Sequence, residues 1–146
     1  MTRSDLSPDL LACQLPATSK KQLLETLCNH LANHASLNER DVLDAVLERE
    51  KLGSTVIGEG IAIPHAMVHG ASTCVSLLAT LEAPVDFDGA NVDLVMLVLG
   101  CENDRTRHLA AMSTALKQLR LSSKSLRNAT QEAELRNALE DLTVAA

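Results

Sequence analysis

The residues with the clearest capacity for chemistry lie between Arg49 and His65, where the sequence reads REKLGSTVIGEGIAIPH. Glycines such as Gly53 let backbone N–H groups approach an anion closely, Ser54 and Thr55 add hydroxyl donors, and an arginine fork matches phosphate oxygens. A neutral imidazole is nucleophilic near pH 7, and the N–P bond that it forms remains high in energy. This pattern favours phosphate chemistry with His65 as the acceptor.

The glycine-rich loop alone is compatible with two interpretations. It could contact phosphate through Gly53, Ser54 and Thr55, or it could be a plain turn between a helix and a strand. It lacks the Lys-Ser/Thr ending of a P-loop, which argues against nucleotide binding. Because glycines flank a short β-branched pair, we expect no regular element between residues 53 and 60.

Two predicted helices precede this loop. Thr18 or Ser19 can cap a helix that ends near His34, and Asn38 can cap a second helix that Gly53 terminates. Arg49 lies at the edge of the apolar stripe of the second helix, where a cation needs an anionic partner or a wet pocket.

The rest of the chain alternates strands and helices. Residues 61–63 read as a short strand with His65 at its end, and the apolar runs 74–81 and 93–99 are typical of buried central strands joined by a connection over 82–91. A helix over 104–121 places His108 in its first turn, and Thr130 caps a last helix. The sequence therefore predicts a single-domain α/β layered sandwich, a mixed central β-sheet flanked by helices.

Composition excludes several functions. The 146 residues suit one domain over 1–146, with 1–17 as an extended leader that includes a short strand near 10–13. The net charge of -6 has the wrong sign for nucleic acid. No apolar run approaches the roughly 20 residues of a membrane span, and no signal peptide is evident, so we expect a cytoplasmic protein with reduced, structural cysteines.

Histidine spacing raises a metal alternative. His30 and His34 are four residues apart, as are His65 and His69, and such pairs can bind zinc. Neither pair has an obvious third ligand. We therefore expect neither a metal nor a cofactor.

Several segments together resemble one family. The GSTVIGEGIAIPH motif at 53–65, PVDFD at 84–88, VDLVMLVLG at 92–100 and RHLAAMSTALKQL at 107–119 are similar to the mannitol/fructose-type enzyme IIA domains of the bacterial phosphotransferase system. Among these domains the chain most resembles the nitrogen-regulatory branch, whose members are free-standing proteins of about this size.

The resemblance implies particular roles. His65 would be phosphorylated at Nε2, Arg49 and His108 would line the same pocket and stabilise the added charge, and the donor would be an HPr-like phosphocarrier. His108 would either donate a hydrogen bond or orient the ring of His65. The implied function is a regulatory phosphohistidine carrier that signals through phosphorylation-dependent protein binding. The alternative is a sugar-specific enzyme IIA that passes phosphate to an enzyme IIB.

The sequence departs from the family pattern at a few positions. Val56 stands where glycine is usual, which puts any conformation with positive φ there in doubt. Gly100 stands where proline is common after the strand, and the connection between Asp88 and Val92 is shorter than usual.

Overall fold

The computed structural model describes residues 8–71, 74–101 and 103–145. One strand and two helices come first, five strands follow, and two helices end the described chain. In chain order the elements are β1 (Leu10–Leu15), α1 (Lys20–Ala35), α2 (Glu39–Leu52), β2 (Val56–Gly58), β3 (Ile61–Ala62), β4 (His65–Val68), β5 (Val75–Phe87), β6 (Ala90–Cys101), α3 (Arg105–Asn128) and α4 (Glu132–Ala145).

The strands form one mixed sheet in the order β1-β5-β6-β3-β2, and β4 pairs with the later part of β6. β5 and β6 are antiparallel, β1 is parallel to β5, and both β3 and β4 are parallel to β6. The predicted mixed central sheet is confirmed.

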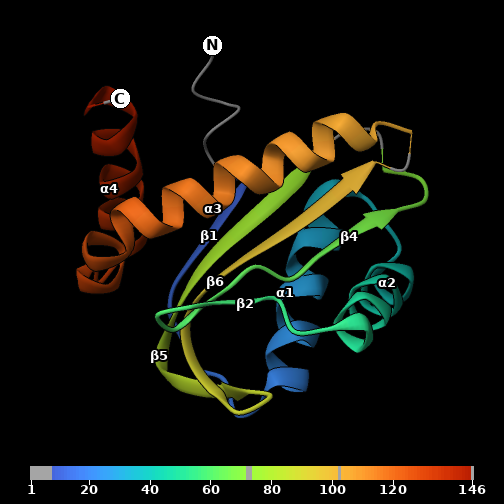
Figure 1. Ribbon diagram of the computed structural model, residues 1–146, viewed down its shortest axis with the longest axis horizontal. Coiled ribbons are helices and arrows are strands. Elements are labelled where there is room, and N and C mark those ends of the chain that lie inside the picture. Colours follow the sequence, from blue (N-terminus) through green and yellow to red (C-terminus); the bar gives the residue numbers. More distant parts are fainter. Residues whose placement is uncertain (1–7, 72–73, 102, 146) are drawn as a thin grey trace.

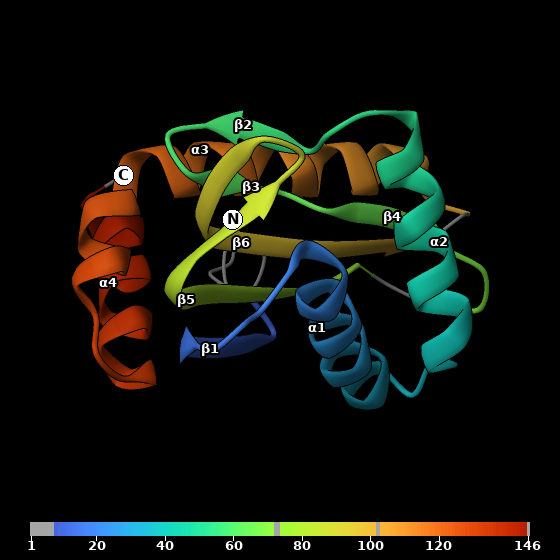
Figure 2. The same cartoon turned by 90° about the horizontal axis from the view of Figure 1, so that it is seen from below.

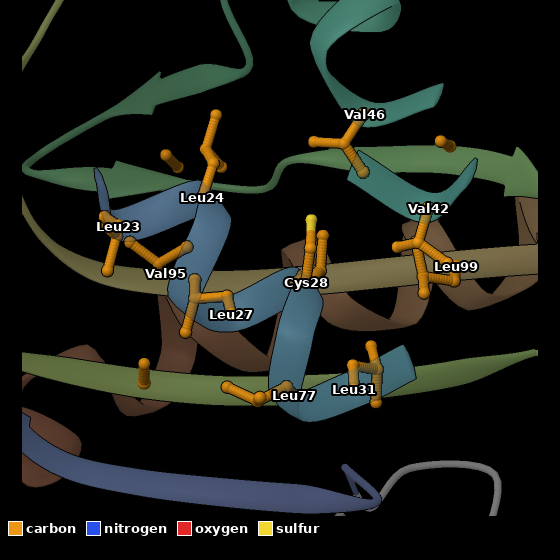
Figure 3. Close-up of a cluster of buried hydrophobic side chains, with 14 of the residues drawn as sticks. Leu23, Leu24, Leu27, Cys28, Leu31, Val42, Val46, Leu77, Val95 and Leu99 are labelled. Carbon is orange, nitrogen blue, oxygen red and sulfur yellow. The ribbon is translucent and has the colours of Figure 1, made fainter. Parts of the chain in front are cut away.

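Helices cover both faces of this sheet, as Figures 1 and 2 show. Alternate residues of β6 point to opposite sides: Val95, Leu97 and Leu99 pack with α1 and α2, whereas Met96 and Val98 pack with α3 and α4. Figure 3 shows the first of these two cores, in which leucines of α1 lie against the sheet. The predicted layered sandwich is therefore confirmed as well.

The expected connection over 82–91 is wrong, because β5 and β6 continue through it as a hairpin. Val85 and Phe87 are buried while Pro84 and Asp86 are exposed, which is the alternation of a strand with one covered face. Pro84 lies in the register shift between Thr80 and Val85, where its missing N–H breaks no regular ladder. The turn at Asp88 and Gly89 has positive φ at both residues, the geometry of a tight hairpin.

The expectation of no regular element over 53–60 is also wrong. Val56 to Gly58 form β2, which pairs antiparallel with β3 through a turn at Glu59 and Gly60. Val56 does not have a positive φ, so a β-branched residue fits where the family usually has glycine.

The helix caps follow the sequence closely. Ser19 caps α1, Asn38 caps α2, and Gly53 ends α2. α3 extends beyond the predicted residue 121 to Asn128, because Leu126 is buried in the core and anchors the last turns.

Candidate functional site

His65 begins a strand rather than ending one, which corrects the placement expected from sequence. β3 and β4 pair one after the other with the same edge of β6. Pro64 separates the two strands because it has no N–H to donate. Its carbonyl still accepts a hydrogen bond from Val98 N at 3.0 Å, and pairing resumes at His65. Ala66 and Val68 are buried in the core beneath α1 and α2, so alternation directs His65 and Met67 to the face that α3 covers.

Arg49 reaches His65 from the last turns of α2. Its Nε donates to His65 Nε2 at 3.2 Å, and its Nη1 donates to the carbonyl of Gly53 at 3.0 Å. The guanidinium is thus held between the start of the loop and the imidazole ring.

These contacts determine which nitrogen of His65 carries the proton. Nδ1 lies 2.8 Å from the carbonyl of Ile63, which can only accept, and Nε2 faces the donating Nε–H of Arg49. Both hydrogen bonds, to the Ile63 carbonyl and from Arg49 Nε–H, can form together only if the ring is neutral and carries its proton on Nδ1. Nε2 therefore carries the free lone pair.

His108 lies beside His65, with the ring centroids 5.8 Å apart. It occupies the first turn of α3, where Asp104 is the N-cap and where its side chain is buried. Burial and, second, the electrostatic effect of the neighbouring His65 lower the pKa of His108 below its ordinary value of 6.5. The ring is therefore neutral at pH 7.

Gly100 makes room for His108. A Cβ at position 100 would lie 2.1 Å from Nδ1 of His108, far inside van der Waals contact. The Nδ1 atom is buried against this strand and has no hydrogen-bond partner among the described residues. The glycine that replaces the usual proline thus lets the imidazole lie against the backbone of β6.

A hollow of about 660 Å³ opens over His65, between α2, β4 and the start of α3. Four large apolar side chains line this hollow, and we call these four together the leucine rim: Leu52, Met67, Leu109 and Met112. Leu52 is 84% exposed and Leu109 is 62% exposed, although both are large and apolar. Nothing in the sequence indicated that either leucine belongs to the site: Leu109 reads as part of the apolar side of its helix, and Leu52 is a single apolar residue at a helix end.

The loop residues proposed as phosphate contacts have other partners. Gly53 O accepts from Arg49, and Ser54 Oγ accepts from Val56 N at 3.2 Å. Thr55 is buried, and its hydroxyl donates to Glu50 Oε2 at 2.5 Å. Sequence analysis also overlooked Glu50, although its position directly after Arg49 was a signal.

The remaining candidate features are metal ligands, cysteines and a second hollow. Within residues 8–71, 74–101 and 103–145, no three His, Cys, Asp or Glu side chains gather as a metal site would require. The four cysteines are free thiols. A second hollow of about 390 Å³ lies between α3 and the start of β5, and no histidine lines it. Over the described ranges no helix is both long and apolar enough to cross a bilayer.

Relatives of known sequence share most of this chain. A nitrogen regulatory protein of Bradyrhizobium diazoefficiens is 39% identical over 118 residues, covering 79% of this chain and 77% of the relative. A nitrogen regulatory protein of Escherichia coli K12 is 33% identical over 144 residues, covering 94% of this chain and 88% of the relative.

Solved structures share the fold. The nitrogen regulatory protein IIA-Ntr of Neisseria meningitidis superposes with a TM-score of 0.79 at 30% identity, covering 89% of this chain and 92% of that one. The IIA mannitol protein of Escherichia coli, at 19% identity and a TM-score of 0.71 over 95% and 99% of the two chains, shares the architecture. Residues 6–142 match the model of the phosphoenolpyruvate-dependent sugar phosphotransferase system, EIIA 2, and the chain therefore belongs to that family.

Proposed function

We propose that the protein is a phosphohistidine carrier of a regulatory, nitrogen-type phosphotransferase system. His65 Nε2 accepts a phosphoryl group from an HPr-like phosphocarrier, and the phosphorylated and free forms bind partner proteins differently. The observation that carries this proposal is the pair of hydrogen bonds that leaves the lone pair on Nε2 and sets Arg49 Nε 3.2 Å from it.

The transfer requires no proton from solvent. Nε2 of His65 attacks phosphorus as the N–P bond of the donor phosphohistidine breaks. The donor nitrogen keeps the bonding electron pair, and the donor ring leaves as a neutral imidazole because its other nitrogen already carries a proton. Nδ1 of His65 retains its proton and its hydrogen bond to Ile63 throughout. In such a displacement the protein mainly positions groups and neutralises charge on the phosphoryl oxygens.

Arg49 and His108 supply that neutralisation. Arg49 now donates to Nε2, so the incoming phosphorus takes the place of this hydrogen bond and the guanidinium turns to the phosphoryl oxygens. A buried lone pair without a partner costs less than a buried N–H without one, so the unpaired Nδ1 of His108 is the unprotonated nitrogen. Nε2–H of His108 is then a neutral donor for the phosphoryl group, the first of the two roles left open by the sequence.

The surroundings of His65 suit a phosphoryl donor that is itself a protein. The hollow is open, and the leucine rim projects apolar surface from both α2 and α3. Exposed apolar residues gathered around a reactive group are typical of protein–protein contact. A phosphoryl group brings about -1.5 to -2 charges into this rim, which is enough to change which partner binds without refolding the domain.

The relatives support regulation rather than sugar transport. Those at 33–39% identity are named nitrogen regulatory proteins. We propose further that the protein acts in the cytoplasm and that residues 1–146 form one domain. The sugar-specific alternative stays open to test, because the 2-O-alpha-mannosyl-D-glycerate-specific EIIABC component of Escherichia coli K12 is 31% identical over 142 residues, which cover 91% of this chain and 21% of that protein.

The first experiment incubates the purified protein with phosphoenolpyruvate, an enzyme I and a matched HPr-type carrier. Intact mass should increase by one acid-labile phosphoryl group, and His65→Ala should show no increase. A wild-type protein that gains no phosphoryl group from a carrier pair that is itself charged would contradict the proposal.

A second experiment separates the two versions of the function. The phosphorylated protein is mixed with sugar-specific enzyme IIB domains of the fructose and mannitol types. We expect no transfer to either type within the time that the carrier needs to phosphorylate this protein. Rapid transfer to one of them would establish the sugar-transport role instead.

A further inference from the structure

Glu50 follows Arg49 in the last turn of α2, yet its side chain turns away from His65. Its carboxylate is 5% exposed. Oε1 lies 2.8 Å from the Nζ atom of Lys20 at the start of α1, and Oε2 accepts from Thr55 Oγ1 at 2.5 Å. A buried carboxylate with two such partners fixes the relative positions of the segments that carry them.

Thr55 passes this constraint to the segment before His65. Its backbone carbonyl accepts a hydrogen bond from Ile63 N at 3.0 Å, while its side chain is held by Glu50. Ile63 is 2% exposed, and its own carbonyl accepts from His65 Nδ1 at 2.8 Å. Three hydrogen bonds, joined through the covalent structure of Thr55 and Ile63, therefore connect Glu50 to the ring of His65.

The last of these three hydrogen bonds selects the tautomer. Which imidazole nitrogen is protonated depends on the hydrogen bond that the other nitrogen makes, and within the described part of the chain Nδ1 meets the Ile63 carbonyl as its acceptor. Moving that carbonyl weakens the preference for Nδ1–H and lets Nε2, the proposed nucleophile, carry the proton for part of the time.

We infer that Glu50 and Thr55 form a positioning pair that sets the tautomer and orientation of His65 for phosphoryl transfer. This inference rests on the proposed function. Neither residue lines the hollow over His65, so neither touches the donor or the phosphoryl group. They act on the reaction through Ile63, and they stabilise the protonation state that leaves Nε2 free to attack.

The test compares three threonine variants. Thr55→Val removes the hydroxyl and keeps the shape, and Thr55→Ser restores a hydroxyl at the same atom. Thr80→Val is the matched control, because Thr80 is also buried and its Oγ1 accepts from Gln14 N at 2.8 Å, in a part of β5 that does not contact the site. Where Thr55→Val does not fold, Glu50→Gln weakens the same hydrogen bond from the acceptor side, because it keeps the shape of the side chain and replaces the carboxylate by a neutral amide.

Two measurements are made on each variant. Nitrogen-15 NMR of the unphosphorylated protein reports the tautomer of His65, and single-turnover phosphorylation at increasing carrier concentration separates the maximal rate from the concentration at half saturation. In Thr55→Val we expect a larger Nε2–H fraction and a maximal rate lower by about tenfold, the effect of one hydrogen bond. The half-saturating concentration should stay unchanged, and Thr55→Ser should restore both properties.

The inference is overturned if Thr55→Val matches Thr80→Val in either measurement, because a merely structural hydroxyl would lower stability in both variants alike. The NMR comparison needs no phosphoryl donor. A wild-type protein that is not phosphorylated would therefore refute the proposed function while the effect of Thr55 on the His65 tautomer is still measured.

Discussion

At the scale of residues, two neighbouring histidines hold their protons on different nitrogens because they meet different groups. The Nδ1–H of His65 donates a hydrogen bond to a carbonyl and leaves the lone pair on Nε2, whereas the Nδ1 of His108 is buried against Gly100 and meets no partner among the described residues. Their types and approximate places could be predicted from sequence. Their tautomers could not be predicted from sequence. They depend on where the Ile63 carbonyl lies and on the close approach of His108 to the backbone of Gly100, which only the folded chain determines.

The lowered pKa of His108 makes stability depend on pH in a definite direction. Below its ordinary pKa of 6.5 the unfolded chain takes up a proton that the folded chain resists, so the stability contributed by neutral His108 is present above pH 6.5 and is lost as pH falls. We expect wild type to lose more unfolding free energy than His108→Gln between pH 7.5 and pH 5.5, as measured by urea denaturation. Equal losses in the two proteins would show that His108 is not held neutral.

Gly100→Ala tests the packing of His108 against β6. The new Cβ would clash with Nδ1 and displace the ring, so we expect a loss of about 2 kcal/mol in unfolding free energy and slower phosphorylation of His65. In a His108→Ala background the same substitution should cost much less, because the clashing ring is gone. A double-mutant cycle by urea denaturation measures this coupling, and purely additive effects would contradict it.

At the scale of elements, the sequence predicted the helices better than the strands. Helix ends have chemical signals in the sequence. Ser19 and Asn38 accept hydrogen bonds from backbone N–H groups at helix starts, and Gly53 ends α2 with a positive φ that suits glycine, so all three act as expected. The hairpin over 82–91 was missed, since Pro84 and two aspartates suggest a loop. What decides the matter is the pairing of Val85 with Val92 across the sheet, a tertiary contact that local propensity does not contain.

The buried face of α1 carries Cys28, whose thiol should be inert in the folded protein. Burial and, second, the charge of Glu39 raise its pKa to about 12, so the reactive thiolate is negligible at pH 8. We expect a variant that retains Cys28 as its single cysteine to react with a thiol reagent only after denaturant is added. A variant that retains only the half-buried Cys13 serves as the comparison, and prompt reaction of Cys28 in native buffer would show that α1 is not packed as described.

At the scale of the whole molecule, the candidate site combines one strand start, the end of one helix and the start of another. The sequence indicated His65, Arg49 and His108 because their residue types suit phosphate and because the segments resemble a family. It did not indicate Lys20, which lies twenty-nine positions before Arg49 and enters the network only through folding. Lys20 Nζ contacts Glu50 Oε1 at 2.8 Å and Asp88 Oδ2 at 2.6 Å, and so joins α1, α2 and the β5–β6 hairpin.

Lys20→Met should destabilise the protein far more than a surface lysine change does. It leaves the buried carboxylate of Glu50 without its cation, so we expect a loss of about 3 kcal/mol in unfolding free energy at pH 7. Lys51→Met is the matched control, because Lys51 pairs with Glu48 where both side chains are exposed, and it should change stability little.

The pH dependence of the Lys20→Met effect identifies its cause. Burial alone would lower the pKa of Lys20, but the carboxylates of Asp88 and Glu50 outweigh burial and raise the pKa above 10.5. A raised folded pKa gives stability that is fully present below pH 10.5 and is lost as pH rises through the folded value. In urea denaturation, the advantage of wild type over Lys20→Met should therefore be constant from pH 7 to pH 9 and should shrink above pH 10.5. An advantage that persists unchanged there would mean that the methylene packing of Lys20, rather than its charge, links the three segments.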